Sequence, residues 1–145
     1  MMRVLTVQQP WADCIVFHGK TVENRTRNLA GSYRGPVAIH AGLRFDENAR
    51  VDLRATVDLA PRADLTFGAI IGVVDLVDAH PVFDCITQQR NADWTVCSEW
   101  AEHSGYHLVF TNPRPLETPL PFRGGLSLRH LDEATERTVL EGLVK

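Results

Sequence analysis

Residues 19–27 (GKTVENRTR) place a lysine, a glutamate and two arginines close together, directly after an apolar run with helical spacing. We expect an extended strand here, whose side chains alternate between two faces. Val22 is the only apolar residue of this segment, so neither face can supply an ordinary core stripe. In a chain with 44% hydrophobic residues, such a strand is either a solvated sheet edge or the wall of a cleft.

Length and charge limit the functions that are open to the chain. Its 145 residues predict one domain over residues 1–145, large enough to bury a hydrophobic core. The formal net charge is −3, which excludes nucleic-acid binding by bulk positive charge. Any site for a polyanion therefore requires a local basic patch.

The cysteines and the N-terminal residues indicate a compartment. Cys14, Cys85 and Cys97 are odd in number and widely spaced, which is typical of free thiols in a reducing environment. No close pair of the His-x-x-x-His kind occurs, so we expect no metal and no cofactor. Residues 1–9 do not resemble a signal peptide, and no apolar run approaches membrane-spanning length. We expect a cytoplasmic protein without a membrane partner.

Short strands outnumber helices in the expected structure. Strands are expected at residues 3–7, 20–27, 36–41, 67–77, 106–110 and 126–131. Helices are expected at residues 10–18, 45–59, 93–103 and 133–144. The prolines of residues 112–115 are expected to end a strand, and residues 119–125 are expected to be irregular. This order favours an α+β fold in which a small mixed β-barrel carries helices at its ends.

Six segments of the chain, in this order, resemble the ASCH domain family of the PUA-like superfamily. The matching segments are residues 9–12 (QPWA), 19–25 (GKTVENR), 34–41 (RGPVAIHA), 72–75 (GVVD), 106–116 (YHLVFTNPRPL) and 119–125 (PLPFRGG). The resemblance covers residues 4 to about 131. It implies a PUA-like barrel of five to six strands with flanking helices, and a cleft between the Gln-Pro-Trp helix start and the charged strand.

The resemblance also implies RNA-related work, namely binding of RNA or of modified nucleosides, with hydrolysis by a few members. One branch removes the acetyl group of N4-acetylcytidine, and a single-strand-specific ribonuclease activity occurs in the family. The deacetylating branch has a threonine nucleophile three residues after its lysine. Glu23 stands at that position here, so we do not expect this chain to be such an amidohydrolase.

Lys20 and Glu23 are the candidate catalytic pair if the protein is an enzyme. Lys20 can bind phosphate or act as a general base, or it can simply be a solvated side chain. Glu23 can accept hydrogen bonds from a base or form an ion pair with Lys20 or Arg25. A regular strand puts residues 20 and 23 on opposite faces, so only a bulge or a twist brings them together.

The remaining candidates form a basic patch with aromatic side chains. The expected ligand-binding residues are Gln9, Trp11, Lys20, Glu23, Arg25, Arg27, Tyr33, Arg34 and Arg123, with Arg114 as a further candidate. The arginines would hold phosphate, and Trp11 or Tyr33 would stack on an unpaired base. For each of them a structural role is the alternative, and His40 and His107 are expected to be satisfied core or rim histidines.

Three functions therefore remain open. The first is a module that binds single-stranded RNA or a modified nucleoside or nucleotide. The second is a hydrolase acting on RNA or on an acylated nucleoside. The third is recognition of a small anionic metabolite or a protein partner by the same cleft.

Overall fold

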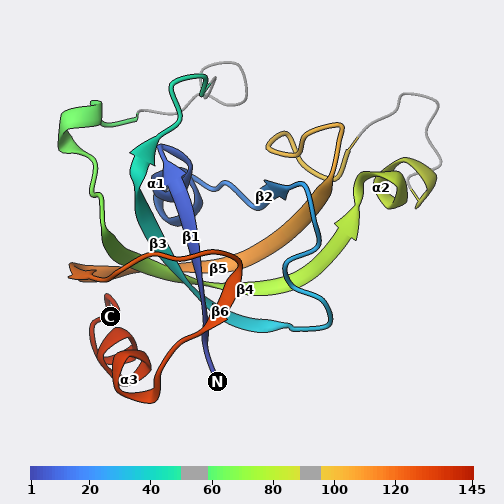
Figure 1. Ribbon diagram of the computed structural model, residues 1–145. Helices are drawn as coiled ribbons and strands as arrows, with labels where there is room; N and C mark the ends of the chain where they lie inside the picture. Colours follow the sequence, from blue (N-terminus) through green and yellow to red (C-terminus); the bar gives the residue numbers. More distant parts are fainter. Residues whose placement is uncertain (50–58, 89–95) are drawn as a thin grey trace.

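The computed structural model describes residues 1–49, 59–88 and 96–145, and it contains one mixed sheet with the strand order β2-β5-β4-β3-β1-β6 (Figure 1). The strands are β1 Arg3–Gln9, β2 Val22–Arg25, β3 Gly35–Phe45, β4 Ala69–Pro81, β5 Tyr106–Pro121 and β6 Leu128–His130. The helices are α1 Trp11–Phe17, α2 Val82–Gln88 and α3 Glu133–Glu141, with a short 3-10 helix at Arg62–Asp64. Strands β1 and β3 are parallel, and the other neighbouring strands are antiparallel.

The six strands confirm the expected strand number, but the sheet does not close into the expected small β-barrel. The ladder ends at β2 on one side and at β6 on the other, and these two strands do not pair within the described ranges. Both edge strands are short, and they lie at different levels of the sheet. Strand β2 pairs with the first residues of β5, whereas β6 pairs with the first residues of β1. The sheet is therefore open, with three short helices packed around it.

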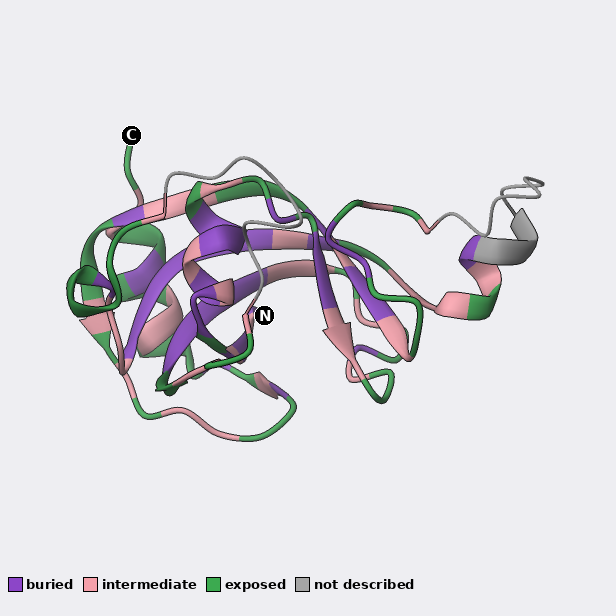
Figure 2. Cartoon of the chain, turned by 90° about the horizontal axis from the view of Figure 1, so that it is seen from above, coloured by how far each residue is buried: buried purple, intermediate pink, exposed green. Residues whose placement is uncertain are grey.

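The two faces of the sheet bury two different sets of side chains. Leu5 and Val7 of β1 pack with the buried face of α1, whereas Met2 and Val4 pack in a second cluster with Val139 of α3. This alternation follows from the two-residue period of a strand. Figure 2 shows that buried residues are concentrated along the middle of the sheet and on α1. Helix α1 thus sits inside the curve of the sheet, where it begins the candidate site.

Strand β5 continues through the prolines that were expected to end it. Its ladder to β4 pairs Thr111 with Asp75 and Arg114 with Val73, so the register shifts across residues 112–113. Asn112 has a φ of 53°, and the unpaired residues form a bulge in which Pro113 does not need to donate a ladder hydrogen bond. The segment before Pro121, which was expected to be irregular, is likewise part of β5.

Two of the expected helices are also wrong in the described residues. Strand β3 extends to Phe45, and turns follow at residues 46–49, where a helix was expected to begin. Residues 96–103 contain bends and a turn in place of the expected helix. The remaining parts of these two predictions, residues 50–58 and 93–95, lie outside the described residues. Helix α2 was not expected, because its seven residues are too few to show a helical repeat of apolar side chains and no N-capping residue marks its start.

Helices α1 and α3 confirm two of the expected elements. Asp132 caps α3, since its side chain accepts a hydrogen bond from Thr135 N at 2.8 Å. Within the residues that the structure describes, no helix is both long and apolar enough to span a bilayer.

Candidate functional site

Lys20 and Glu23 come together because Lys20 precedes the strand. Helix α1 ends at Phe17, and Gly19 has a φ of +72°, a conformation that glycine adopts without a steric penalty. The chain therefore leaves the helix at Gly19, and β2 begins at Val22. The alternation of a regular strand does not apply to residue 20, and its side chain can turn toward the face that Glu23 occupies.

Lys20, Glu23 and Arg25 form a hydrogen-bonded triad of charges. Lys20 Nζ lies 3.1 Å from Glu23 Oε1 and also donates to the carbonyl of Val22. Arg25 donates to Glu23 Oε2 from Nη2 at 2.9 Å and from Nε at 3.2 Å. Lys20 is only 3% exposed and Glu23 only 7%, whereas the Arg25 side chain is 28% exposed. Arg25 is thus the member of the triad that a ligand can reach.

The triad holds Glu23 in its ionised form and carries a net positive charge. Burial acts to raise the pKa of Glu23, but the charges and hydrogen bonds of Lys20 and Arg25 outweigh burial and hold this pKa below its usual value. Two cations therefore surround one carboxylate at neutral pH. The net charge of +1 in a poorly hydrated place favours the approach of an anion.

Trp11, the first residue of α1, lies against Lys20 of the triad. The Lys20 ammonium lies 5.5 Å from the centroid of the Trp11 ring, within the range of a cation–π contact. The indole N–H donates to Asp46 Oδ2 at 2.8 Å, and Trp100 packs edge-on at 6.5 Å between ring centroids. Trp11 remains partly exposed, so this ring is held in a fixed orientation with part of its surface open to solvent.

Gln9 anchors the same helix start. Its side chain is fully buried, donates from Nε2 to the Thr66 carbonyl at 2.8 Å and accepts from Asp13 N at 2.9 Å. Both ends of the amide are therefore occupied by the protein. These contacts give Gln9 a positioning role beneath the candidate site.

Arg25 connects the triad, through Thr6 of β1, to the segment that contains Gly124 and Gly125. Its Nη2 donates to the Thr6 carbonyl at 2.9 Å, although three strands separate β2 from β1 in the ladder. The sheet must therefore curve strongly enough to bring β2 over β1. Thr6 Oγ1 in turn accepts a hydrogen bond from Gly125 N at 3.2 Å, and the exposed Arg123 lies next to this glycine pair.

His40 is a satisfied histidine that fixes this segment, which agrees with the role expected for it. Burial lowers the pKa of His40, so the ring is neutral, and its Nε2–H donates to the Phe122 carbonyl at 2.8 Å. The Nδ1 atom then accepts from the Thr6 hydroxyl at 3.1 Å. A Cβ at Gly124 would lie 2.8 Å from His40 Cε1, so only glycine allows this close approach.

Tyr33 and Arg34 lie in a different group of contacts. The Arg3 guanidinium lies 4.7 Å from the Tyr33 ring centroid, and the Tyr33 hydroxyl donates to the Pro36 carbonyl at 2.7 Å. Arg34 is exposed, donates to the Tyr33 carbonyl at 2.7 Å and lies 3.8 Å from Asp78. Arg27 is exposed in the turn after β2. The structure therefore brings Trp11, Lys20, Glu23 and Arg25 together. Tyr33 and Arg34 make their contacts elsewhere, and Arg27 is exposed after β2.

Sequence reasoning missed three residues that hold the site together. Thr6, Asp46 and Trp100 contact Arg25 or Trp11 from distant parts of the chain. Their spacing from residues 11 and 25 follows no motif.

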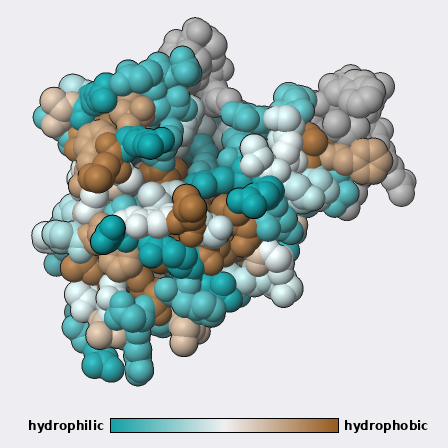
Figure 3. Space-filling view, viewed as in Figure 1, coloured by the Kyte–Doolittle hydropathy of each residue, from teal (hydrophilic) through white to brown (hydrophobic). Residues whose placement is uncertain are grey.

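In the space-filling view the surface is hollowed between the lobe at upper left and the arm at right (Figure 3). A separate cavity of about 200 Å³ lies against α3 and is lined by Leu120, Pro121, Phe122, Ala134, Thr135 and Thr138.

The lowered pKa of Glu23 predicts a pH-dependent contribution to stability. Because the folded pKa lies below the ordinary value of 4.5, the stabilisation is complete above that pH and is lost as the pH falls through the folded pKa. Glu23→Gln has no such titration. Urea unfolding at pH 7 and at pH 3 should therefore show a difference between wild type and Glu23→Gln that shrinks in acid. An equal difference at both pH values would contradict this assignment.

The comparisons with known proteins define the class of fold. Three structures of an ASCH protein from Zymomonas mobilis align over 99% of this chain. The protein itself gives a TM-score of 0.56 at 14% identity over 96% of its length, and a Tyr-to-Phe mutant gives 0.57 at 16% identity over 99%. These alignments show that the chain has the ASCH fold.

Sequence relatives agree with that result. The chain is 27% identical to activating signal cointegrator 1 of Mus musculus and of Homo sapiens over 148 aligned residues. The alignment takes in 97% of this chain but only 24% of each relative, so the chain spans about a quarter of their length. No family model matches the chain. Together, the relatives and the solved structures confirm the resemblance to ASCH domains that the sequence motifs indicated.

Proposed function

We propose that the chain binds a nucleotide unit of single-stranded RNA, or a modified nucleoside, at the surface formed by Trp11 and the triad. The observation that carries this proposal is the Lys20–Glu23–Arg25 triad, in which the partly exposed Arg25 is joined through Glu23 to the buried Lys20, whose ammonium lies 5.5 Å from the ring centroid of the partly exposed Trp11. Such a surface offers one positive group, Arg25, and one aromatic ring, Trp11, which are connected through Lys20. Nucleotides present the matching pair of groups, a phosphate and a base.

The burial of the triad is hard to explain by stability alone. Removing the charges of Lys20 and Glu23 from water carries a large desolvation cost, and replacing a buried ion pair by apolar side chains is often neutral or stabilising. A buried and strongly coupled set of charges at a partly exposed position is therefore a candidate for function. Its contacts to α1, β1 and β2 also hold Arg25 in one orientation, which reduces the entropy lost when a ligand binds.

Each member of the site has a distinct role in this proposal. Arg25 contacts a phosphate or a base carbonyl, and Arg27 and Arg123 extend the positive surface along a strand of RNA. Trp11 stacks on an unpaired base. Lys20 is almost fully enclosed, so it acts mainly by fixing Glu23 and by adding positive charge beneath the ring of Trp11.

A hydrolase is the second candidate, because Lys20 Nζ and Glu23 Oε1 lie 3.1 Å apart, within the reach of proton transfer. The lowered pKa of Glu23 makes this carboxylate a poor general acid, so Glu23 would have to direct water as a base. Incubation of labelled RNA and of N4-acetylcytidine, with and without Mn²⁺, tests this candidate. Equal and negligible turnover by wild type and Lys20→Ala would remove it.

Binding to single-stranded RNA is expected to depend on salt and on these side chains. Each phosphate contact contributes a slope of roughly −0.7 to the plot of log K against log salt concentration, so Arg123→Gln should reduce the slope by about that amount. Trp11→Ala should weaken binding by about 1–3 kcal/mol. Fluorescence anisotropy with single-stranded RNA, duplex RNA and free nucleosides at two salt concentrations measures both effects.

The matched control is Arg137→Gln, which removes an exposed arginine on α3 and should leave affinity and salt slope close to wild type. Salt-independent signals with every RNA and nucleoside would contradict the proposal. In that case, a screen of small anionic metabolites and of protein partners would test the third function for the same surface.

A further inference from the structure

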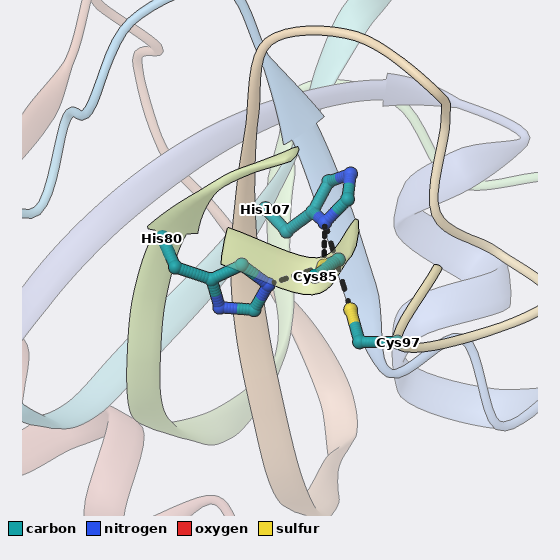
Figure 4. A group of neighbouring side chains, drawn as sticks. All are labelled: His80, Cys85, Cys97 and His107. Atoms are coloured by element: carbon teal, nitrogen blue, oxygen red, sulfur yellow. Dashed lines mark hydrogen bonds between the residues drawn. The ribbon is translucent and has the colours of Figure 1, made fainter. Parts of the chain in front are cut away.

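A second group of polar side chains lies at the far end of the β4–β5 pair, outside the candidate nucleotide site. His80, Cys85, Cys97 and His107 point toward one another (Figure 4), and one ligand atom from each lies within 4.8 Å of the others. They come from four different places: the end of β4, helix α2, the segment before β5 and the start of β5. Because their spacing in sequence matches no metal motif, the sequence led us to expect no metal.

The fold explains how the two histidines meet. His80 and His107 are cross-strand partners in the antiparallel pairing of β4 and β5, and their rings contact edge-on with 5.3 Å between centroids. Helix α2 starts directly after β4, which brings Cys85 back over this pair of residues. The buried Cys85 and the exposed Cys97 then complete the group, with Cys97 on the side that is open to solvent.

The distances within the group are close to those of a tetrahedral zinc site. Cys85 Sγ lies 2.9 Å from His80 Nε2 and 3.2 Å from His107 Nδ1, and Cys97 Sγ lies 3.5 Å from the same His107 nitrogen. Zinc–sulfur and zinc–nitrogen bonds correspond to ligand–ligand distances of about 3.3–3.8 Å in a tetrahedron. Small shifts of these side chains would therefore accommodate one ion at their centre.

Both imidazoles are already oriented as metal ligands. His80 Nδ1 lies 2.8 Å from Asp78 Oδ2, and His107 Nε2 lies 2.7 Å from the Glu102 carbonyl. Each of these nitrogens must carry the proton in a neutral ring, because its partner only accepts hydrogen bonds. The other nitrogen of each ring therefore directs a lone pair at sulfur, His80 Nε2 at Cys85 Sγ and His107 Nδ1 at the sulfur atoms of Cys85 and Cys97. A carboxylate or a backbone carbonyl on the outer nitrogen is the usual arrangement behind metal-bound histidines.

We propose that His80, Cys85, Cys97 and His107 bind one Zn²⁺ ion as a structural site. Two thiolates and two imidazoles in a tetrahedral arrangement are typical of zinc. The four ligand atoms are close enough to bind the same ion, whereas the ligands of a two-iron cluster are divided between two irons. Binding releases the two thiol protons to solvent and leaves a neutral centre. With four protein ligands, no coordination position is open for a substrate.

The ion would tie α2 and the segment before β5 to the end of the sheet. That segment also supports the candidate nucleotide site, because Asn24 of β2 donates to the Trp100 carbonyl at 2.9 Å and accepts from Glu102 N at 2.8 Å. Zinc binding should therefore stabilise the surroundings of Trp100 and β2 without contacting an RNA ligand.

The test is the metal content of the full chain after expression in zinc-supplemented medium. We expect about one zinc per chain for wild type and for the control Cys14→Ala, which removes the cysteine outside the group. Cys97→Ser should hold at most a tenth of that amount, and its exposed position limits any effect on folding. Cobalt substitution of wild type should give the visible bands of a tetrahedral ion together with thiolate-to-cobalt charge transfer.

Asp78→Asn tests the orientation of His80 separately, because it leaves all four ligands in place. We expect zinc affinity to fall by about 10–100-fold, measured by competition with a chromophoric chelator. Three results would overturn the proposal: zinc-free wild type without cobalt bands, equal zinc in wild type and Cys97→Ser, or a Cys85–Cys97 disulfide found by mass spectrometry in protein purified with an alkylating reagent.

Discussion

Glu23→Ala is expected to lower the free energy of unfolding by about 3–5 kcal/mol, as is typical when one partner of a buried ion pair is removed. Lys20, which is 3% exposed, would lose its counter-charge, and Arg25 would lose the acceptor of two hydrogen bonds. Urea unfolding at pH 7 measures the loss. Lys20→Met combined with Glu23→Leu should recover part of it, because the double variant buries no uncompensated charge at these two positions.

Glu133→Ala is the matched control for this experiment. Glu133 forms an ion pair with Arg137 on α3 at 3.8 Å, in which both side chains are exposed, and such pairs contribute little. Its removal should change stability by less than about 0.5 kcal/mol. If Glu23→Ala and Glu133→Ala had equally small effects, the triad would be a solvated surface cluster and the argument from its burial would fail.

Trp100→Ala is expected to have the second large effect, a loss of about 3–5 kcal/mol. The ring is 2% exposed and packs with Cys14, Val22 and Trp11 in one cluster, so alanine leaves a cavity behind the site. The same variant should weaken RNA binding, because Trp11 loses its edge-on neighbour. Thermal unfolding and anisotropy measure the two effects.

Leu126→Ala is the control, since Leu126 is 89% exposed and its truncation should be nearly neutral. Trp100→Phe should retain part of both stability and binding, because an aromatic ring still fills most of the space. A Trp100→Ala protein with wild-type stability would show that the ring is not part of the core.

Much of the fold could be predicted from the sequence where local patterns determine the structure. The apolar run of β4 and the helical spacing of residues 11–15 both gave the correct element type. Strand β5 could not be predicted beyond residue 110, because a bulge at Asn112 allows prolines to remain within a strand. The open edges of the sheet depend on the lengths of β2 and β6, which local propensity does not specify.

In the candidate site, too, the residues that lie close in sequence could be predicted and those from distant segments could not. Lys20, Glu23 and Arg25 stand within six residues of one another, so a motif could reveal them. Thr6 comes from β1 and is brought to the site by the curvature of the sheet, whereas Trp100 comes from the segment before β5, which is hydrogen-bonded to Asn24 of β2. The His80–His107 pair likewise depends on the register between β4 and β5, which spacing along the chain does not disclose.

Mapping of the RNA contacts by NMR tests the central proposal most directly. Unlabelled single-stranded RNA is titrated into ¹⁵N-labelled protein, and the amide and side-chain N–H signals that shift are assigned. Binding at the triad predicts the largest changes at the Trp11 indole, the Arg25 side chain and the amides of residues 20–25. Changes confined to the α3 cavity around Thr135, or no changes at saturating RNA, would contradict it.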